Sequence, residues 1–153
     1  MTAAELDEKR EALVDAPCYV IDFLPRQVPA DGGERYFPQE RYFAEHPQID
    51  GLYARFARLI LCLCCYYAAA AERFPDGGWI EDPSPDILAE LVEGCAADGE
   101  NRYLTVLFPG EDVLFTLDGG DLYMSLYNPA DRFLADVSAL AAAHGLFVRE
   151  AAG

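Results

Sequence analysis

The chain has 153 residues, of which 52% are hydrophobic and 25% charged, and its formal net charge is −16. This length and apolar content favour one domain with a core of its own and exclude a wholly disordered chain. Most of the excess acid lies in residues 72–136. A nucleic-acid binder needs a basic stripe, so the composition excludes that class. The acidity indicates either a solvated surface or a patch for a basic partner.

The start of the chain indicates a cytoplasmic protein. The first residues, MTAAELDEKREALVD, are charged and acidic, whereas a signal peptide begins basic and continues apolar. No apolar run approaches the roughly 20 residues that a membrane-spanning helix needs. We therefore expect no membrane association.

Five cysteines are an odd number in a chain without an export signal, so we expect reduced, buried thiols. Cys62, Cys64 and Cys65 form a cluster inside an apolar run. The cluster has no second C-x-x-C and no nearby histidine, so core packing is favoured over a metal or redox site. We expect neither a metal nor a cofactor.

The first part of the chain alternates helix and strand. Residues 3–14 are predicted as a short charged helix, and 18–24 as a strand because they are rich in β-branched and aromatic residues. Prolines and an Asp-Gly-Gly triplet then predict a loop over 25–35, followed by a short helix from near Pro38. A loop of this length is longer than most connections need, so it is a candidate binding element.

A strong amphipathic helix is predicted after Asp50, its expected N-cap. Apolar side chains recur there at helical spacing, namely Leu52, Phe56, Leu59, Ile60 and Leu63. Continuing that helix to residue 72 would make it apolar all round, so a strand is preferred at 64–71. The four alanines at 68–71 favour a helix instead.

Two further helices have clear start signals. Ser84-Pro85-Asp86 supplies an N-cap, a proline at the first position and an acid in the first turn. The apolar face of this helix is expected to consist of Ile87, Leu88, Leu91 and Val92. Asn128-Pro129-Ala130-Asp131 predicts the second start, and His144 with Gly145 predicts its end. A last strand is expected at 146–149.

Residues 102–127, RYLTVLFPGEDVLFTLDGGDLYMSLY, predict three antiparallel strands. Two-residue loops at Pro109-Gly110 and Gly119-Gly120 would place Phe115 opposite both Leu104 and Met124, and would make one face wholly apolar. With the other elements, this predicts one α+β domain over 1–153. Its sheet is mainly antiparallel, with helices packed on the apolar face.

The opposite face of these strands is rich in hydroxyl groups, from Tyr103, Thr105, Thr116, Tyr123, Ser125 and Tyr127. Tyrosine is enriched at interfaces because it joins a large apolar ring to a polar tip. All of these residues except Thr105 are the candidate binding residues. Three arrangements fit: a face open to a partner, a homodimer interface, or a face covered by residues 25–43.

Catalytic signals are weak. A cysteine nucleophile needs a histidine base and a group that orients it, which here means Cys18, His46 or His144, and Asp22. No family signature surrounds Cys18, and nucleotide, zinc-protease and hydrolase motifs are absent from the sequence. The acids flanking Gly119-Gly120 lack the ligand pattern of an EF-hand loop. We therefore name no catalytic or metal-binding residue.

The segment APCYVIDFLPRQVP, residues 16–29, resembles the start of an uncharacterised family of small bacterial proteins. That family shares a PCYVID-x-LP-x-QVP stretch, a following Tyr-Phe pair, here Tyr36-Phe37, and a similar Tyr127-Asn128-Pro129 helix start. The resemblance implies a bacterial, cytoplasmic protein. It carries over no catalytic or binding residue.

These patterns together favour a small acidic protein that acts by binding another protein or itself. One version is an immunity-type or antitoxin-like inhibitor, whose acidity steers it to a basic protein. The alternative is a small-molecule or enzymatic site between the 25–43 loop and the sheet.

Overall fold

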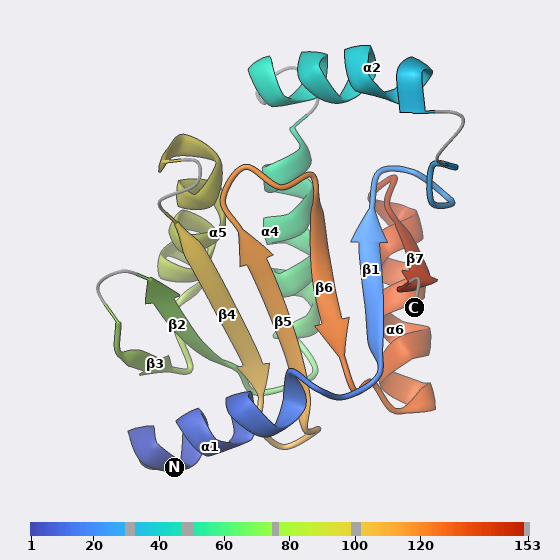
Figure 1. The fold of residues 1–153 in the computed structure, drawn as a ribbon. Coiled ribbons are helices and arrows are strands. Elements are labelled where there is room, and N and C mark those ends of the chain that lie inside the picture. Colours follow the sequence, from blue (N-terminus) through green and yellow to red (C-terminus); the bar gives the residue numbers. More distant parts are fainter. Residues whose placement is uncertain (30–32, 47–50, 75–76, 99–101, 152–153) are drawn as a thin grey trace.

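The structure is a computed structural model that describes residues 1–29, 33–46, 51–74, 77–98 and 102–151. Within these residues the chain forms the predicted α+β fold, with a seven-stranded antiparallel sheet (Figure 1). The strands, in the order in which they lie side by side, are β3 (Trp79–Glu81), β2 (Ala70–Phe74), β4 (Tyr103–Phe108), β5 (Val113–Asp118), β6 (Tyr123–Tyr127), β1 (Cys18–Asp22) and β7 (Phe147–Glu150).

The helices are distributed unequally over the two faces of the sheet. The helices α4 (Leu52–Leu63), α5 (Pro85–Asp98) and α6 (Asp131–Ala143) cover one face (Figure 1). The main core lies between them and the sheet, as predicted, and includes the fully buried rings of Phe56, Phe108, Phe115 and Phe133. On the other face, α1 (Ala3–Leu13) crosses the lower end of the sheet, and α2 (Gly33–Glu45) lies above the upper end.

Helix α4 has the predicted apolar stripe but a different start. Its stripe residues are all buried against the sheet and the neighbouring helices. The predicted N-cap, Asp50, lies outside the described residues, and the observed N-cap is Gly51, in the left-handed region with φ 65°. Gly51 forms no side-chain cap hydrogen bond, so tertiary packing rather than capping stabilises this helix. Among the described residues, no helix is both long and apolar enough to cross a membrane.

The predicted strand at 64–71 is wrong over most of its length. The backbone N–H groups of Cys65, Tyr66 and Tyr67 donate to carbonyls in the last turn of α4, so these residues form tight turns rather than a strand. Strand β2 begins at Ala70. The alanines there are small side chains between close layers: Ala70 packs under α1, and Ala71 in the main core.

The other two helix starts agree with the sequence in part. Helix α5 begins at Pro85, and the Ile87 N–H donates to the Ser84 hydroxyl at 3.4 Å. Ile87 itself is 41% exposed, unlike the other residues of the predicted apolar face. Helix α6 starts at Asp131, the end of the predicted start segment, and its N-cap is Ala130 rather than Asn128. Asn128 adopts φ 62°, and its side-chain amide donates to the Asp112 carbonyl at 2.9 Å.

The predicted registers of β4, β5 and β6 are each wrong by two residues. Phe115 lies opposite Val106 and Leu126, not opposite Leu104 and Met124. Both connections are four residues long rather than two, and each closes with an N–H donated back to the last strand carbonyl. A shift of two preserves the side-chain faces, because side chains alternate with a period of two. The predicted separation into an apolar face and a hydroxyl face is therefore confirmed.

Candidate binding face of the sheet

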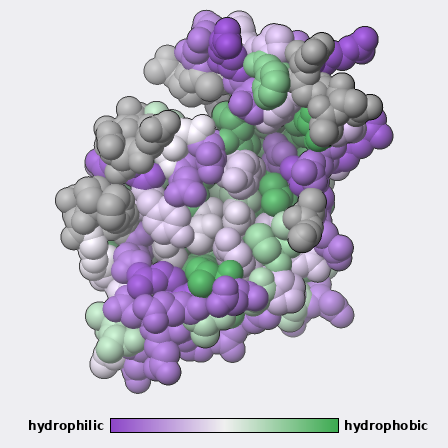
Figure 2. Space-filling view, viewed as in Figure 1, coloured by the Kyte–Doolittle hydropathy of each residue, from purple (hydrophilic) through white to green (hydrophobic). Residues whose placement is uncertain are grey.

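The hydroxyl-rich side chains form one continuous surface, which we call the open face: Tyr103, Thr105, Thr116, Tyr123, Ser125 and Tyr127. The register places Thr105, Thr116 and Ser125 side by side across the centre of β4, β5 and β6. All five predicted binding residues therefore lie together. Figure 2 views this side of the molecule and shows a pale hollow of weakly polar surface between the purple surfaces of α1 and α2.

Helix α1 covers only the lower end of this side of the sheet. It buries two apolar side chains, Leu6 and Leu13, against Leu107, Leu114 and Ala70. Tyr127 borders this cluster, whereas Tyr123 is 43% exposed. The described part of residues 25–43 does not replace α1 as the cover, because α2 lies beyond the upper end of the strands (Figure 1). At the centre of the face, Thr116 and Ser125 stay partly exposed, whereas Thr105 beside them is fully buried.

Polar contacts fix α1 in place. A capping box between Thr2 and Glu5 starts the helix, and its hydrogen bonds lower the pKa of Glu5. Arg10 forms an ion pair with Glu72 of β2, and the Trp79 indole N–H donates to Asp7 at 2.8 Å. These contacts set the lower boundary of the open face.

The upper end of the open face is acidic. Asp118 ends β5, and Asp121 follows in the turn before Tyr123. Burial raises the pKa of Asp121, and the neighbouring charge of Asp118 and that of Glu40 on α2 raise it further. Burial likewise raises the pKa of Tyr123, and the charges of Asp121 and Asp118 raise it further. Carboxylates and phenols therefore share a partly desolvated region.

A buried ion pair lies beside this region, on β1 and β7. The Arg149 guanidinium donates to the Asp22 carboxylate at 2.9 Å, and Asp22 is 6% exposed. Tyr36 of α2 lies close to this pair; its pKa is raised, first by burial and then by a hydrogen bond with Glu40. Phe43 packs edge-on against Phe23, with ring centroids 5.0 Å apart, which attaches α2 to the end of β1.

One polar atom on this side of the sheet, the Nε of Arg149, is buried and has no hydrogen-bond partner among the described residues. The buried Thr105 hydroxyl interacts with that of Tyr103, which offsets part of the rise that burial causes in the pKa of Tyr103. Thr105 is 0% exposed. Native interiors leave few polar groups unpaired, and bound water commonly satisfies them.

The candidate cysteine–histidine site is not assembled. The Nδ1 atoms of His46 and His144 each contact a carbonyl in their own helix, at 2.9 and 2.7 Å, and Asp22 is bound by Arg149. The Cys18 thiol donates to the Tyr19 carbonyl at 3.5 Å. No nucleophile–base–orienter chain therefore exists among these four residues.

Two members of the cysteine cluster, Cys64 and Cys65, line a surface cavity, and Cys64 also packs against the main core. Of the five free thiols, that of Cys95 is buried, those of Cys18, Cys62 and Cys64 are half-buried, and that of Cys65 is exposed. The expectation of buried, packed thiols is therefore confirmed for Cys95, while Cys64 packs against the core only in part. It is wrong for Cys65, because the chain leaves α4 at residue 64 and turns at the surface. Within the described residues, no group of three or more metal-ligating side chains could hold a metal ion.

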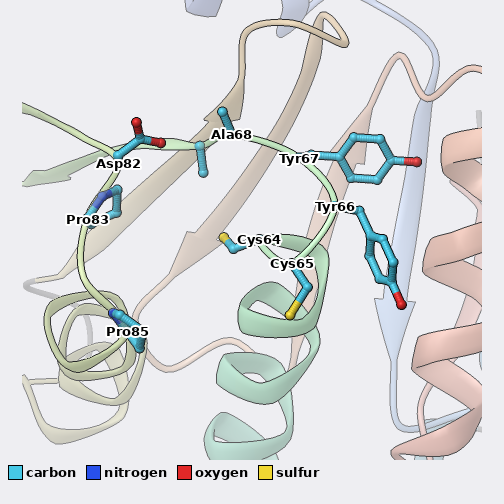
Figure 3. A pocket seen from close by; sticks show the side chains of 9 residues that line it. Cys64, Cys65, Tyr66, Tyr67, Ala68, Asp82, Pro83 and Pro85 are labelled. Carbon is cyan, nitrogen blue, oxygen red and sulfur yellow. The ribbon is translucent and has the colours of Figure 1, made fainter.

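That cavity has a volume of about 430 Å³ and lies between the end of α4 and the Asp82-Pro83 turn (Figure 3). The side chains of Tyr66 and Tyr67 point away from Asp82, and the Tyr67 hydroxyl donates to Asp136 of α6 at 2.6 Å. Burial raises the pKa of Cys64 to about 11, which disfavours the reactive thiolate. The cavity therefore lacks convergent chemical groups.

Comparison with protein-family models, with curated proteins and with solved structures gave no match to this chain. The candidate site therefore rests on the geometry alone. Sequence reasoning missed the contribution of Asp22, Arg149 and α2, because residues distant in the chain meet only once the strand order is known.

Proposed function

We propose that the chain acts by binding a basic protein through the open face. The observation that carries this proposal is the pairing of a partly exposed, tyrosine-rich sheet surface with an acidic upper end. Tyrosines supply contact area at a low entropic cost, and complementary charge steers the encounter. An immunity-type or antitoxin-like inhibitor of a basic enzyme is one form that such a protein takes.

The net charge of −16 also bears on which partner fits. Self-association through the open face would bring the same acidic end of two copies into one interface, where like charges disfavour contact. A basic partner gains from the same charges, and its affinity should fall as salt screens them.

Site-specific photo-cross-linking tests this proposal. A benzophenone side chain at position 123, on the open face, is compared with one at Ser138, an exposed position of α6 on the helix-covered side. In the native host we expect position 123 to capture a protein of positive net charge, and position 138 not to capture it. The captured protein, once purified, should bind the chain with a Kd that rises with salt.

A variant completes the test. Tyr123→Ser should weaken this binding by more than about tenfold, because truncating an interface tyrosine that anchors a complex commonly costs about 2 kcal/mol or more. The melting temperature should stay close to that of the parent, because Tyr123 is exposed in the free chain. Equal capture from both positions, or capture of a second copy of the chain alone, would contradict the proposal.

A further inference from the structure

The two edge strands of the sheet, β3 and β7, differ in how they are protected. At the β3 edge, residues of α1 and the N-terminus contact the strand. The Trp79 indole N–H donates to Asp7 at 2.8 Å, and the ammonium group of Met1 pairs with Glu81 at 3.1 Å. Strand β3 is only three residues long, and Asp82, in the left-handed region with φ 46°, follows it. Short length and a covering element are common means of preventing an edge from pairing with another chain.

Strand β7 leaves one side of its backbone unpaired within the part of the chain that the structure describes (Figure 1). The Ala151 N–H donates to the Cys18 carbonyl at 3.0 Å. Hydrogen-bonded pairs alternate along an antiparallel ladder, so the N–H and C=O groups of Val148 and Glu150 point away from β1. Outward donors and acceptors in a row fit the backbone of another strand.

The β7 edge is held in place without being blocked. The Arg55 guanidinium of α4 donates to the carbonyls of His144 and Gly145, at 3.3 and 3.1 Å, which fixes the turn before the strand. The strand contains neither proline nor lysine. Its one basic residue, Arg149, donates to the Asp22 carboxylate of β1. The edge is therefore ordered before any partner strand arrives, which lowers the entropic cost of pairing.

The local charge favours a second copy of the chain as the partner of this edge. Residues 137–153 contain one acid, Glu150, and one base, Arg149, whereas the whole chain has a net charge of −16. Two copies that meet at β7 therefore bring little charge of like sign into contact. A basic partner gains correspondingly little at this edge, in contrast to the open face.

Symmetry and charge select one register for such a pairing. In a two-fold antiparallel pair, residues whose backbone points outward must lie opposite one another. A two-fold centre at Arg149 would place two arginines side by side, and a centre at Glu150 two glutamates, which are both unfavourable. A centre at Val148 places two valines opposite each other. It also places Phe147, which is 42% exposed, opposite Arg149 of the other copy, so that a cation meets a ring.

We propose that the chain forms a two-fold dimer in which β7 pairs antiparallel with β7 of a second copy, centred on Val148. The Val148 N–H of each copy then donates to the Val148 carbonyl of the other, and the Glu150 N–H to the Leu146 carbonyl. The two sheets become one continuous sheet. This inference does not rest on the proposed function, because the pairing leaves the open face free. Salt should strengthen the dimer by screening the repulsion between two acidic chains, whereas salt should weaken binding of a basic protein.

Sedimentation equilibrium of the full chain tests the dimer with two variants of one exposed residue. Glu150→Pro and Glu150→Ala remove the same charge, but only proline also removes the outward N–H. Proline is tolerated at an edge where the N–H does not bond within the sheet. We expect Glu150→Ala to dimerise with a Kd within about threefold of the parent value. Glu150→Pro should dimerise at least about tenfold more weakly, because each copy loses a hydrogen bond across the interface.

Disulfide cross-linking in a cysteine-free background tests the register. Val148→Cys should form a covalent dimer on mild oxidation, because the Cα atoms of a hydrogen-bonded antiparallel pair lie about 5.5 Å apart. Glu150→Cys is the matched control and should not form one. A rise of about 3.4 Å per residue places the two copies of residue 150 more than about 13 Å apart.

Four outcomes overturn the inference. They are a parent chain that stays monomeric at about 1 mM, equal dimerisation of the proline and alanine variants, a dimer that weakens as salt rises, and cross-linking at position 150 but not at 148. Thermal melts show whether Glu150→Pro is folded. If it is not, the two cysteine variants decide the question.

Discussion

Replacement of Leu6 by alanine tests how α1 is held on the sheet. Leu6 is 1% exposed and packs with Leu13 against Leu107 and Leu114. Truncating a buried leucine costs about 2–5 kcal/mol, and we expect about 2–3 kcal/mol because a surface helix can settle into the space. In a chain of this size that corresponds to a fall in melting temperature of roughly 4 to 12 °C.

Urea denaturation measures the loss, and Val14→Ala is the matched control. Val14 is 42% exposed just after α1, so its truncation should cost less than about 0.5 kcal/mol. Limited trypsin digestion gives a local measurement, because Lys9 and Arg10 lie within α1. Leu6→Ala should speed cleavage there, while the rest of the chain stays resistant. Equal costs for the two variants would refute the view that Leu6 anchors this helix.

Three other predictions concern the open face and the thiols. In a cysteine-free background, cysteines at Thr116 and Ser125 should cross-link readily, whereas cysteines at Thr116 and Tyr123 should not; the reverse result would restore the two-residue hairpin. Asp121→Asn should raise stability at about pH 7. Because the pKa of Asp121 is raised in the folded chain, ionised Asp121 disfavours the folded state, and this penalty vanishes as the pH falls below about 4. Equal urea midpoints for Asp121→Asn and the parent at both pH values would contradict this prediction. The Cys65 thiol should react first with Ellman's reagent in the folded chain, and faster reaction at another cysteine would refute the assigned exposures.

The helices and the faces of the sheet could be predicted because they depend on local periodicity. The stripe of α4 and the Ser84-Pro85 start are signals within one or two turns. The strand registers were not predictable to the residue, since they depend on loop length. Glycines at 119–120 suit a two-residue turn. The Tyr53 hydroxyl of α4 hydrogen-bonds the backbone of this turn, however, and the loop is four residues long.

The segment after α4 illustrates the same limit. Its composition suits helix, strand or buried turn, and tertiary position decides among them. The candidate site was predicted only in its centre, from alternation along β4, β5 and β6. Its boundaries come from α1, α2, Asp22 and Arg149, whose positions follow from long-range packing.

The position of β1 has a consequence for the order of folding. This strand, residues 18–22, lies between β6 and β7, which are formed by residues 123–127 and 147–150. During synthesis, β1 emerges early but cannot pair with either neighbour until more than a hundred further residues have been made. Until then the backbone groups of β1 have no strand partner, and the side chain of Ile21, which is buried in the folded chain, has no core to pack in. We therefore expect the pairing of β1 with β6 and β7 to be among the last steps in the formation of the sheet.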